Sequence, residues 1–177
     1  MRLVLPASIA LVALLAPACS SGSSSSSSEA TRCLYRDVFA ALDEVRGVGA
    51  LCPTWLPDGV RPTYINASVV PEYVVEFEPF RELFPHVVLQ LTQGEPPGKR
   101  LGEDDVGSAR ATIYLQPSPS NGAAGLHSGH YIVAFPGGAY QQGSYWVSVH
   151  EDSQRSRQAN IQRVLKIARS LRPVSPR

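Results

Sequence analysis

The chain has 177 residues, of which 44% are hydrophobic, and its 16 lysine and arginine residues nearly balance 15 acidic ones to give a formal net charge of +1. This length corresponds to a single domain with a sizeable core, once an N-terminal leader is set aside. The balanced charge lacks the strongly basic character of nucleic-acid-binding proteins, so we expect no nucleic acid among the partners.

The start of the chain differs in composition from the rest. A short basic start precedes an apolar run over residues 3–15, and residues 20–28 are almost entirely serine. This pattern is typical of a secretory signal peptide, and the apolar run is too short to span a membrane. We therefore predict a signal peptide over residues 1–18, followed over residues 19–30 by a flexible serine-rich tether that begins with Cys19.

The end of the signal peptide has two interpretations. Ala16-Pro17-Ala18 fits the site of an ordinary signal peptidase, which would release a secreted protein. Ala18 followed by Cys19 resembles instead the lipobox of bacterial lipoproteins, in which a small residue precedes the cysteine that receives diacylglycerol. This resemblance implies that Cys19 carries the lipid and anchors the protein to the extracytoplasmic face of the cell membrane.

The cysteine count supports the lipoprotein interpretation. The chain has 3 cysteines, Cys19, Cys33 and Cys52, and an odd number in an exported protein requires an explanation. Lipid attachment at Cys19 provides one, and Cys33 and Cys52 are then expected to form a disulfide in an oxidising compartment. Such a bond would close a loop of about twenty residues and contribute about 3 kcal/mol to stability.

Residues 31–46 are predicted to form the first helix, because apolar residues recur there at helical spacing. These residues are Leu34, Val38, Ala41, Leu42 and Val45. Thr31 is a candidate N-cap, and Gly47 is well placed just after the last turn. Residues 53–62 are predicted to form a turn-rich connection, in which Trp55 either plugs the core or lies exposed in a ligand cleft.

Alternating apolar and polar residues dominate the middle of the chain and predict strands. The candidate strands cover residues 63–70, 73–77, 86–92, 109–116, 130–135 and 144–150. Residues 94–107, which include the acidic cluster Glu103–Asp105, and residues 117–125 are predicted to be loops. Strict alternation and short connections indicate an antiparallel sheet with one covered face.

A final helix is expected to begin at Asp152 or Ser153 and to end near Leu171, before Pro173. From Ser153 onward the chain has seven basic residues and no acidic one, so this helix either lies on an acidic surface or has a solvated basic face, or else it binds anionic lipid headgroups or wall polymers. The predicted class is α+β: an antiparallel sheet of about five or six strands with an N-terminal and a C-terminal helix packed on one face. This single domain covers residues 31–173, and residues 174–177 form a tail.

The order of short motifs suggests a family. Leu-Pro-Asp-Gly at residues 56–59 opens the series of strands, and the last helix ends in Ile-Ala-Arg-Ser-Leu at residues 167–171. This arrangement resembles small envelope lipoproteins of Gram-positive bacteria, and it is similar in pattern to the extracytoplasmic domains of anti-sigma-factor-like and sporulation lipoproteins. The resemblance implies a single α+β domain without a known catalytic centre, and it does not specify an activity.

The sequence contains no recognisable catalytic motif, such as a Gly-x-Ser-x-Gly elbow or a His-Glu-x-x-His helix. We therefore expect no enzyme activity and no cofactor. His127, His130 and His150 are the candidate ligands if a metal binds at all, since a hairpin would bring them together and zinc favours imidazole. The simpler interpretation places His127 in a polar loop and His130 at the start of a strand, without a metal.

Aromatic residues on or near neighbouring strands are the candidate binding residues. If Tyr114, Tyr131 and Trp146 share the side of the sheet away from the helices, they would form a surface for a peptide, glycan or lipid; otherwise they are ordinary sheet packing. We therefore predict a lipid-anchored envelope lipoprotein with a non-catalytic binding or accessory role. Its expected partners are the membrane, through the lipid, and an envelope protein, glycan or lipid. The alternatives are an envelope hydrolase acting on wall or lipid material and an assembly factor of a membrane complex.

Overall fold

The computed structural model describes residues 32–47, 49–67, 73–79, 86–117, 129–137 and 143–174. The predicted signal peptide, Cys19, the serine-rich tether, Thr31 and His127 lie outside these residues.

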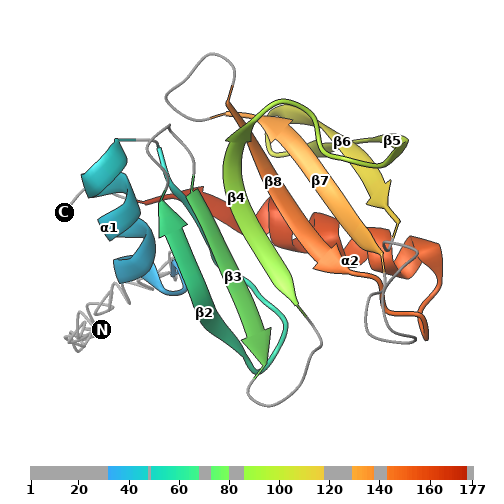
Figure 1. Cartoon of the computed structure of the whole chain (residues 1–177), viewed down its shortest axis with the longest axis horizontal. Helices are drawn as coiled ribbons and strands as arrows, with labels where there is room; N and C mark the ends of the chain where they lie inside the picture. Colours follow the sequence, from blue (N-terminus) through green and yellow to red (C-terminus); the bar gives the residue numbers. More distant parts are fainter. Residues whose placement is uncertain are drawn as a thin grey trace, which may run out of the picture. The chain divides into compact units, whose positions relative to one another are not determined.

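The described residues form a large antiparallel sheet and a small one (Figure 1). In this part of the chain the large sheet has seven strands in the order β2-β3-β4-β8-β7-β6-β5. The strands are β2 (Val60–Ala67), β3 (Tyr73–Pro79), β4 (Val87–Gln93), β5 (Lys99–Val106), β6 (Ala109–Gln116), β7 (His130–Pro136) and β8 (Gly143–His150). In the small sheet β1 (Leu51–Pro53) pairs with β9 (Leu171–Pro173). The predicted α+β class and antiparallel sheet are confirmed, but the predicted strand number of five or six is wrong.

The main error concerns the acidic segment that was predicted to be a loop. It forms the edge strand β5, which pairs with β6 through a tight turn at Gly107, where φ is 60°. Because most residues of an edge strand remain in contact with solvent, they show no apolar alternation that would reveal them. Glu103 on this strand accepts hydrogen bonds from Arg100 and Arg110, and hydrogen bonding from Arg110 is the main cause that lowers the pKa of the Glu103 carboxyl.

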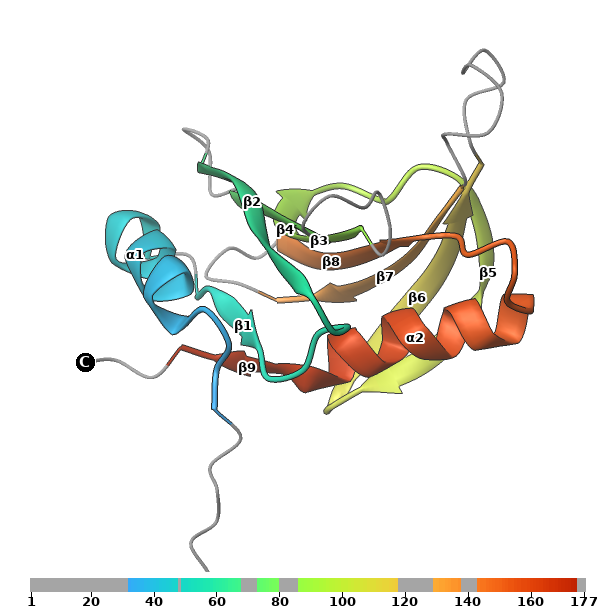
Figure 2. The same cartoon turned by 90° about the horizontal axis from the view of Figure 1, so that it is seen from below.

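The last helix, α2 (Arg157–Ser170), begins later than predicted because Ser156 is its N-cap. The Ser156 hydroxyl accepts a hydrogen bond from the Ala159 amide at 3.2 Å, which satisfies one of the free donors at the helix start. Figure 2 shows α2 lying along one face of the large sheet, where it contacts β5, β7 and β8. We call this the inner face of the sheet and the opposite side the outer face.

The basic C-terminal helix lies on the acidic edge strand. Arg169 of α2 donates hydrogen bonds to the Asp104 carboxylate at 2.7 Å and to the Asp105 carbonyl at 3.0 Å. Part of the excess charge of this helix is therefore paired within the domain, as expected if the helix lies on an acidic surface. Neither helix in the described part of the chain has the length and apolar character that crossing a membrane would require.

The first helix, α1 (Arg36–Arg46), is shorter than predicted at its N-terminus. Tyr35 adopts a left-handed conformation with φ of 52°, which prevents the helix from extending further back. The Tyr35 hydroxyl donates to the Val60 carbonyl at 2.8 Å, and the ring of Phe39 packs against the rings of Tyr73 and Phe77 on β3. At the other end Gly47, with φ of 60°, terminates the helix as predicted.

The predicted disulfide between Cys33 and Cys52 is confirmed, with the two Cα atoms 5.6 Å apart. Cys52 lies in β1 and is fully buried, while Cys33 precedes α1. The bond therefore joins the segment before α1 to β1. Because β1 pairs with β9, which directly follows α2, it also connects the two ends of the domain.

Candidate functional site on the outer face of the sheet

The period-two alternation of the strands divides the large sheet into two chemically different faces. On the inner face, Val75, Leu89, Val133 and Val147 pack in one buried cluster with Leu165 of α2. On the outer face the alternating positions are mixed, with apolar, amide, hydroxyl and imidazole side chains. The outer face therefore contains the polar groups that are available for recognition.

A groove of about 450 Å³ crosses the outer face of the sheet. It is lined by Tyr64, Asn66, Val74, Glu76, Val88, Gln90, Pro97, Gln116, His130, Ile132, Trp146 and Ser148. Most of the polar lining groups are neutral amides and hydroxyls, and Glu76 is the acidic lining residue. Such a combination of apolar surface with a few polar groups is typical of small-molecule sites.

Two of the three aromatic residues predicted for binding lie on this outer face, and one does not. Tyr114 and Trp146 pack with Ile132 and Ala134 in a small outer cluster, and Trp146 also lines the groove. The indole Nε1 of Trp146 is buried and has no hydrogen-bond partner among the described residues. Tyr131 is 1% exposed, belongs to the inner core and therefore contributes nothing to the outer surface.

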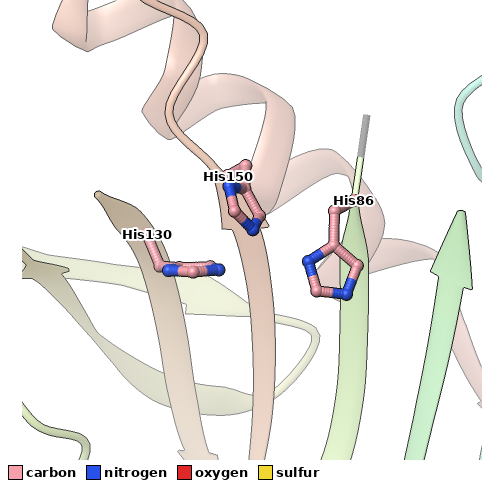
Figure 3. A group of neighbouring side chains, drawn as sticks. All are labelled: His86, His130 and His150. Atoms are coloured by element: carbon pink, nitrogen blue, oxygen red, sulfur yellow. The ribbon is translucent and has the colours of Figure 1, made fainter. Parts of the chain in front are cut away.

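Three imidazoles meet beside the groove, on the outer face of neighbouring strands (Figure 3). His130 of β7 is the register partner of His150 of β8. The His150 amide donates to the His86 carbonyl at 3.2 Å, which places His86 opposite His150 at the start of β4. We call these three residues the histidine row. Their rings are close: the centroids of His130 and His150 are 3.9 Å apart, and those of His86 and His150 are 4.8 Å apart.

His86 is flanked by carboxylates on β3. Its Nε2 atom is 3.5 Å from Glu76 Oε2 and 3.9 Å from Glu78 Oε1. Nε2 is nevertheless buried without a hydrogen bond, so these contacts are electrostatic and their geometry leaves the nitrogen unsatisfied. The other ring nitrogen of His86 faces the remaining two imidazoles in Figure 3.

Within the row, His130 is held in its neutral state. Burial, with a further contribution from the neighbouring His86, lowers the pKa of His130 to about 4. A neutral imidazole retains a free lone pair, which is the form that acts as a base or as a metal ligand.

No known protein family matches the chain, and no curated protein does. A fold of this class is compatible with many functions, so the chemistry of the site is the guide to what the protein does.

The sequence prediction of the histidine set is correct in part. His130 and His150 come together as the hairpin suggested, whereas His127 lies outside the described residues. His86 was not among the predicted ligands, and it reaches the row only because β4 pairs with β8 rather than with β5, its neighbour in sequence. A local signal was present in the alternation of residues 86–92, which assigns His86 and Gln90 to one face.

The other tryptophan, Trp55, lies at a different site. Trp55 borders a hollow of about 540 Å³ with Gln162, Lys166, Arg169 and Ser170. The Lys166 ammonium lies 3.7 Å from the centroid of the Trp55 ring and makes a cation–π contact with it. Because Lys166 already covers this ring, Trp55 is a weaker candidate for ligand stacking than Trp146.

Proposed function

We propose that the protein is an envelope lipoprotein that is anchored to the cell membrane through a lipid on Cys19 and binds a ligand in the outer-face groove without catalysing a reaction. The apolar leader, the serine-rich tether and the resemblance to lipobox sequences support the anchor. The Cys33–Cys52 disulfide supports export, because structural disulfides persist mainly in oxidising compartments. A secreted form of the same domain is the alternative.

In this proposal both helices cover the inner face of the sheet and leave the outer face open to ligand. The contacts of α2 with β7 and β8 and of Phe39 with the rings of β3 support this arrangement. A ligand on the outer face would then be bound by rigid strands, which hold side chains more precisely than loops do.

The observation that carries the binding proposal is Trp146, which lines the groove among neutral amides. Gln90 and Gln116 line the same groove, and each amide offers both donors and an acceptor. An aromatic ring provides apolar contact area while the amides satisfy hydroxyl groups, so this lining fits a neutral, hydroxyl-rich ligand. Among the envelope ligands expected from the sequence, a glycan of the cell wall fits this chemistry best.

Tryptophan fluorescence tests the proposal directly, because the chain has 2 tryptophans at separate sites. In a W55F variant, Trp146 is the fluorophore, and soluble wall oligosaccharides should shift its emission in a saturable way. In the matched W146F variant, Trp55 reports on the distant site and its emission should stay constant. A saturable shift of the Trp55 emission in W146F, or no shift of the Trp146 emission in W55F, would contradict the groove assignment.

The anchor is tested separately by fractionation. The wild-type chain should be recovered from the membrane fraction with an N-terminal mass that includes fatty acyl chains. A C19S variant should be found outside that fraction, since it has no thiol for lipid attachment. An unmodified N-terminus in wild-type protein would contradict the anchor and favour the secreted form.

The histidine row favours a hydrolase acting on wall material as the second candidate function. Several ionisable groups converge beside the groove, including neutral His130 and the Glu76 carboxylate, and such convergence is typical of acid–base sites. Incubation with wall oligosaccharides, followed by mass spectrometry of the products, separates the two functions. Cleavage by wild-type protein that is lost in H130Q would support the hydrolase, and intact oligosaccharide would support the binding role.

A further inference from the structure

The histidine row has the composition and placement of a metal centre. Its members extend from the same face of β7, β8 and the start of β4. One ring nitrogen of each residue lies within 4.8 Å of a ring nitrogen of the other two. We propose that His86, His130 and His150 bind one divalent transition-metal ion, with zinc as the ion that this donor set fits best.

The spacing of the row is compatible with coordination after small ring rotations. Zinc binds imidazole nitrogen at about 2.0–2.1 Å in tetrahedral geometry, so two ligand nitrogens on one ion are about 3.3 Å apart. Neighbouring strands are separated by about 4.8 Å, and the side chains must close the remaining distance. We expect rotation about the Cα–Cβ and Cβ–Cγ bonds to close this distance.

The electrostatics of the row also favour an ion. Three adjacent imidazoles cannot all be protonated without strong mutual repulsion, and each neutral imidazole has a lone pair that can coordinate a metal ion. A divalent cation between the three rings would be coordinated by these lone pairs.

Glu76 acts as a positioning residue in this proposal. A histidine that binds a metal through one nitrogen commonly donates the other N–H to a carboxylate, which fixes the tautomer and the ring orientation. His86 presents one ring nitrogen to the other imidazoles (Figure 3) and Nε2 to Glu76 Oε2 at 3.5 Å. The unsatisfied Nε2 would then become a hydrogen-bond donor to Glu76 when the ring settles on the ion.

The donor set decides the class of ion. Calcium and magnesium require several oxygen ligands, whereas three imidazoles suit zinc and other borderline transition metals. A set of three protein ligands leaves one position of a tetrahedral ion open. His130 belongs to both the row and the groove lining, so this open position would lie beside the groove.

Zinc binding by the purified full-length chain tests the proposal without any oligosaccharide, so its outcome is independent of the groove ligand. The protein is stripped with a chelator and titrated with Zn²⁺ against a chromogenic competitor, and we expect one equivalent to bind. Loss of one ligand should cost at least as much as loss of an outer-shell partner, so H86Q, H130Q and H150Q should each weaken binding about 100-fold or more.

The remaining histidine of the chain provides the matched control. H127Q removes an imidazole that the structure does not assign to the row and should bind zinc like the wild type. No stoichiometric binding by wild-type protein would overturn the proposal. Unchanged affinity in the row variants, or loss of binding in H127Q, would overturn the assignment of these residues.

A measurement on wild-type protein removes the dependence on variants that fold poorly. The X-ray absorption fine structure of the zinc-loaded chain should show imidazole scattering from about three histidines at about 2.0–2.1 Å. The Co²⁺-substituted protein should show the intense visible bands of tetrahedral coordination. A shell of oxygen ligands with fewer than two imidazoles would contradict a centre built on the row.

Discussion

Removal of the Cys33–Cys52 disulfide should lower the free energy of unfolding by about 3 kcal/mol. The bond joins residues separated by 19 positions, and the chain-entropy cost of closing such a loop in the unfolded state corresponds to about this value. Replacing the fully buried Cys52 by alanine adds a small packing loss. The contacts of Phe39 with Tyr73 and Phe77 do not require the bond, so the fold should persist with reduced stability.

Urea unfolding followed by circular dichroism measures this effect. For m-values of about 1–3 kcal/mol/M, a loss of 3 kcal/mol lowers the unfolding midpoint by about 1–3 M. Wild-type protein in dithiothreitol and the C33A/C52A variant should show similar midpoints, and dithiothreitol should have no effect on the variant. If thiol titration shows complete reduction while the wild-type midpoint stays within about 0.3 M of its oxidised value, the loop-closure argument is refuted.

Three further predictions concern single positions. G98A should destabilise the protein by more than about 1 kcal/mol, because Gly98 has φ of 111° and an added Cβ would collide with the β6 backbone; G102A, where an added Cβ meets nothing, should change the thermal midpoint little. In metal-free protein, NMR titration should place the pKa of His130 near 4; since the usual value is about 6.5, the folded state binds fewer protons, and stability should fall as pH decreases from about 6.5 to about 4. Replacing His86 should raise the pKa of His130. E76Q should weaken zinc binding about 10-fold without changing stoichiometry, and equal affinity would remove Glu76 from the site.

The sheet could be predicted where each strand has one face in the core. β3, β4 and β8 show clear alternation because they are central strands with one face in the core. The edge strand β5 lacks this pattern, and its pairing with β6 rather than its own residues makes it a strand. The start of α1 was misplaced because a non-glycine residue in a left-handed conformation, as at Tyr35, has no signature in the periodicity.

The candidate site was harder to predict than the fold. His130 and His150 lie in consecutive strands, so a hairpin brings them together by local pairing. His86 joins them through the long-range pairing of β4 with β8, which no local pattern specifies. The error at Tyr131 was avoidable, because it alternates with His130 and Ile132 and must therefore face the other side of β7.

The register that aligns the histidine row is maintained from the inner face of the sheet. Val87, Val149 and Tyr131 are the residues adjacent to the histidines on β4, β8 and β7; Val87 and Tyr131 each pair with Val149, and all three are at most 2% exposed. Burying each such side chain contributes about 1.5–3 kcal/mol. A shift of one residue would expose Val87 to solvent and turn His86 into the core, so the apolar residues stabilise the alignment of the imidazoles even though they do not touch the outer surface.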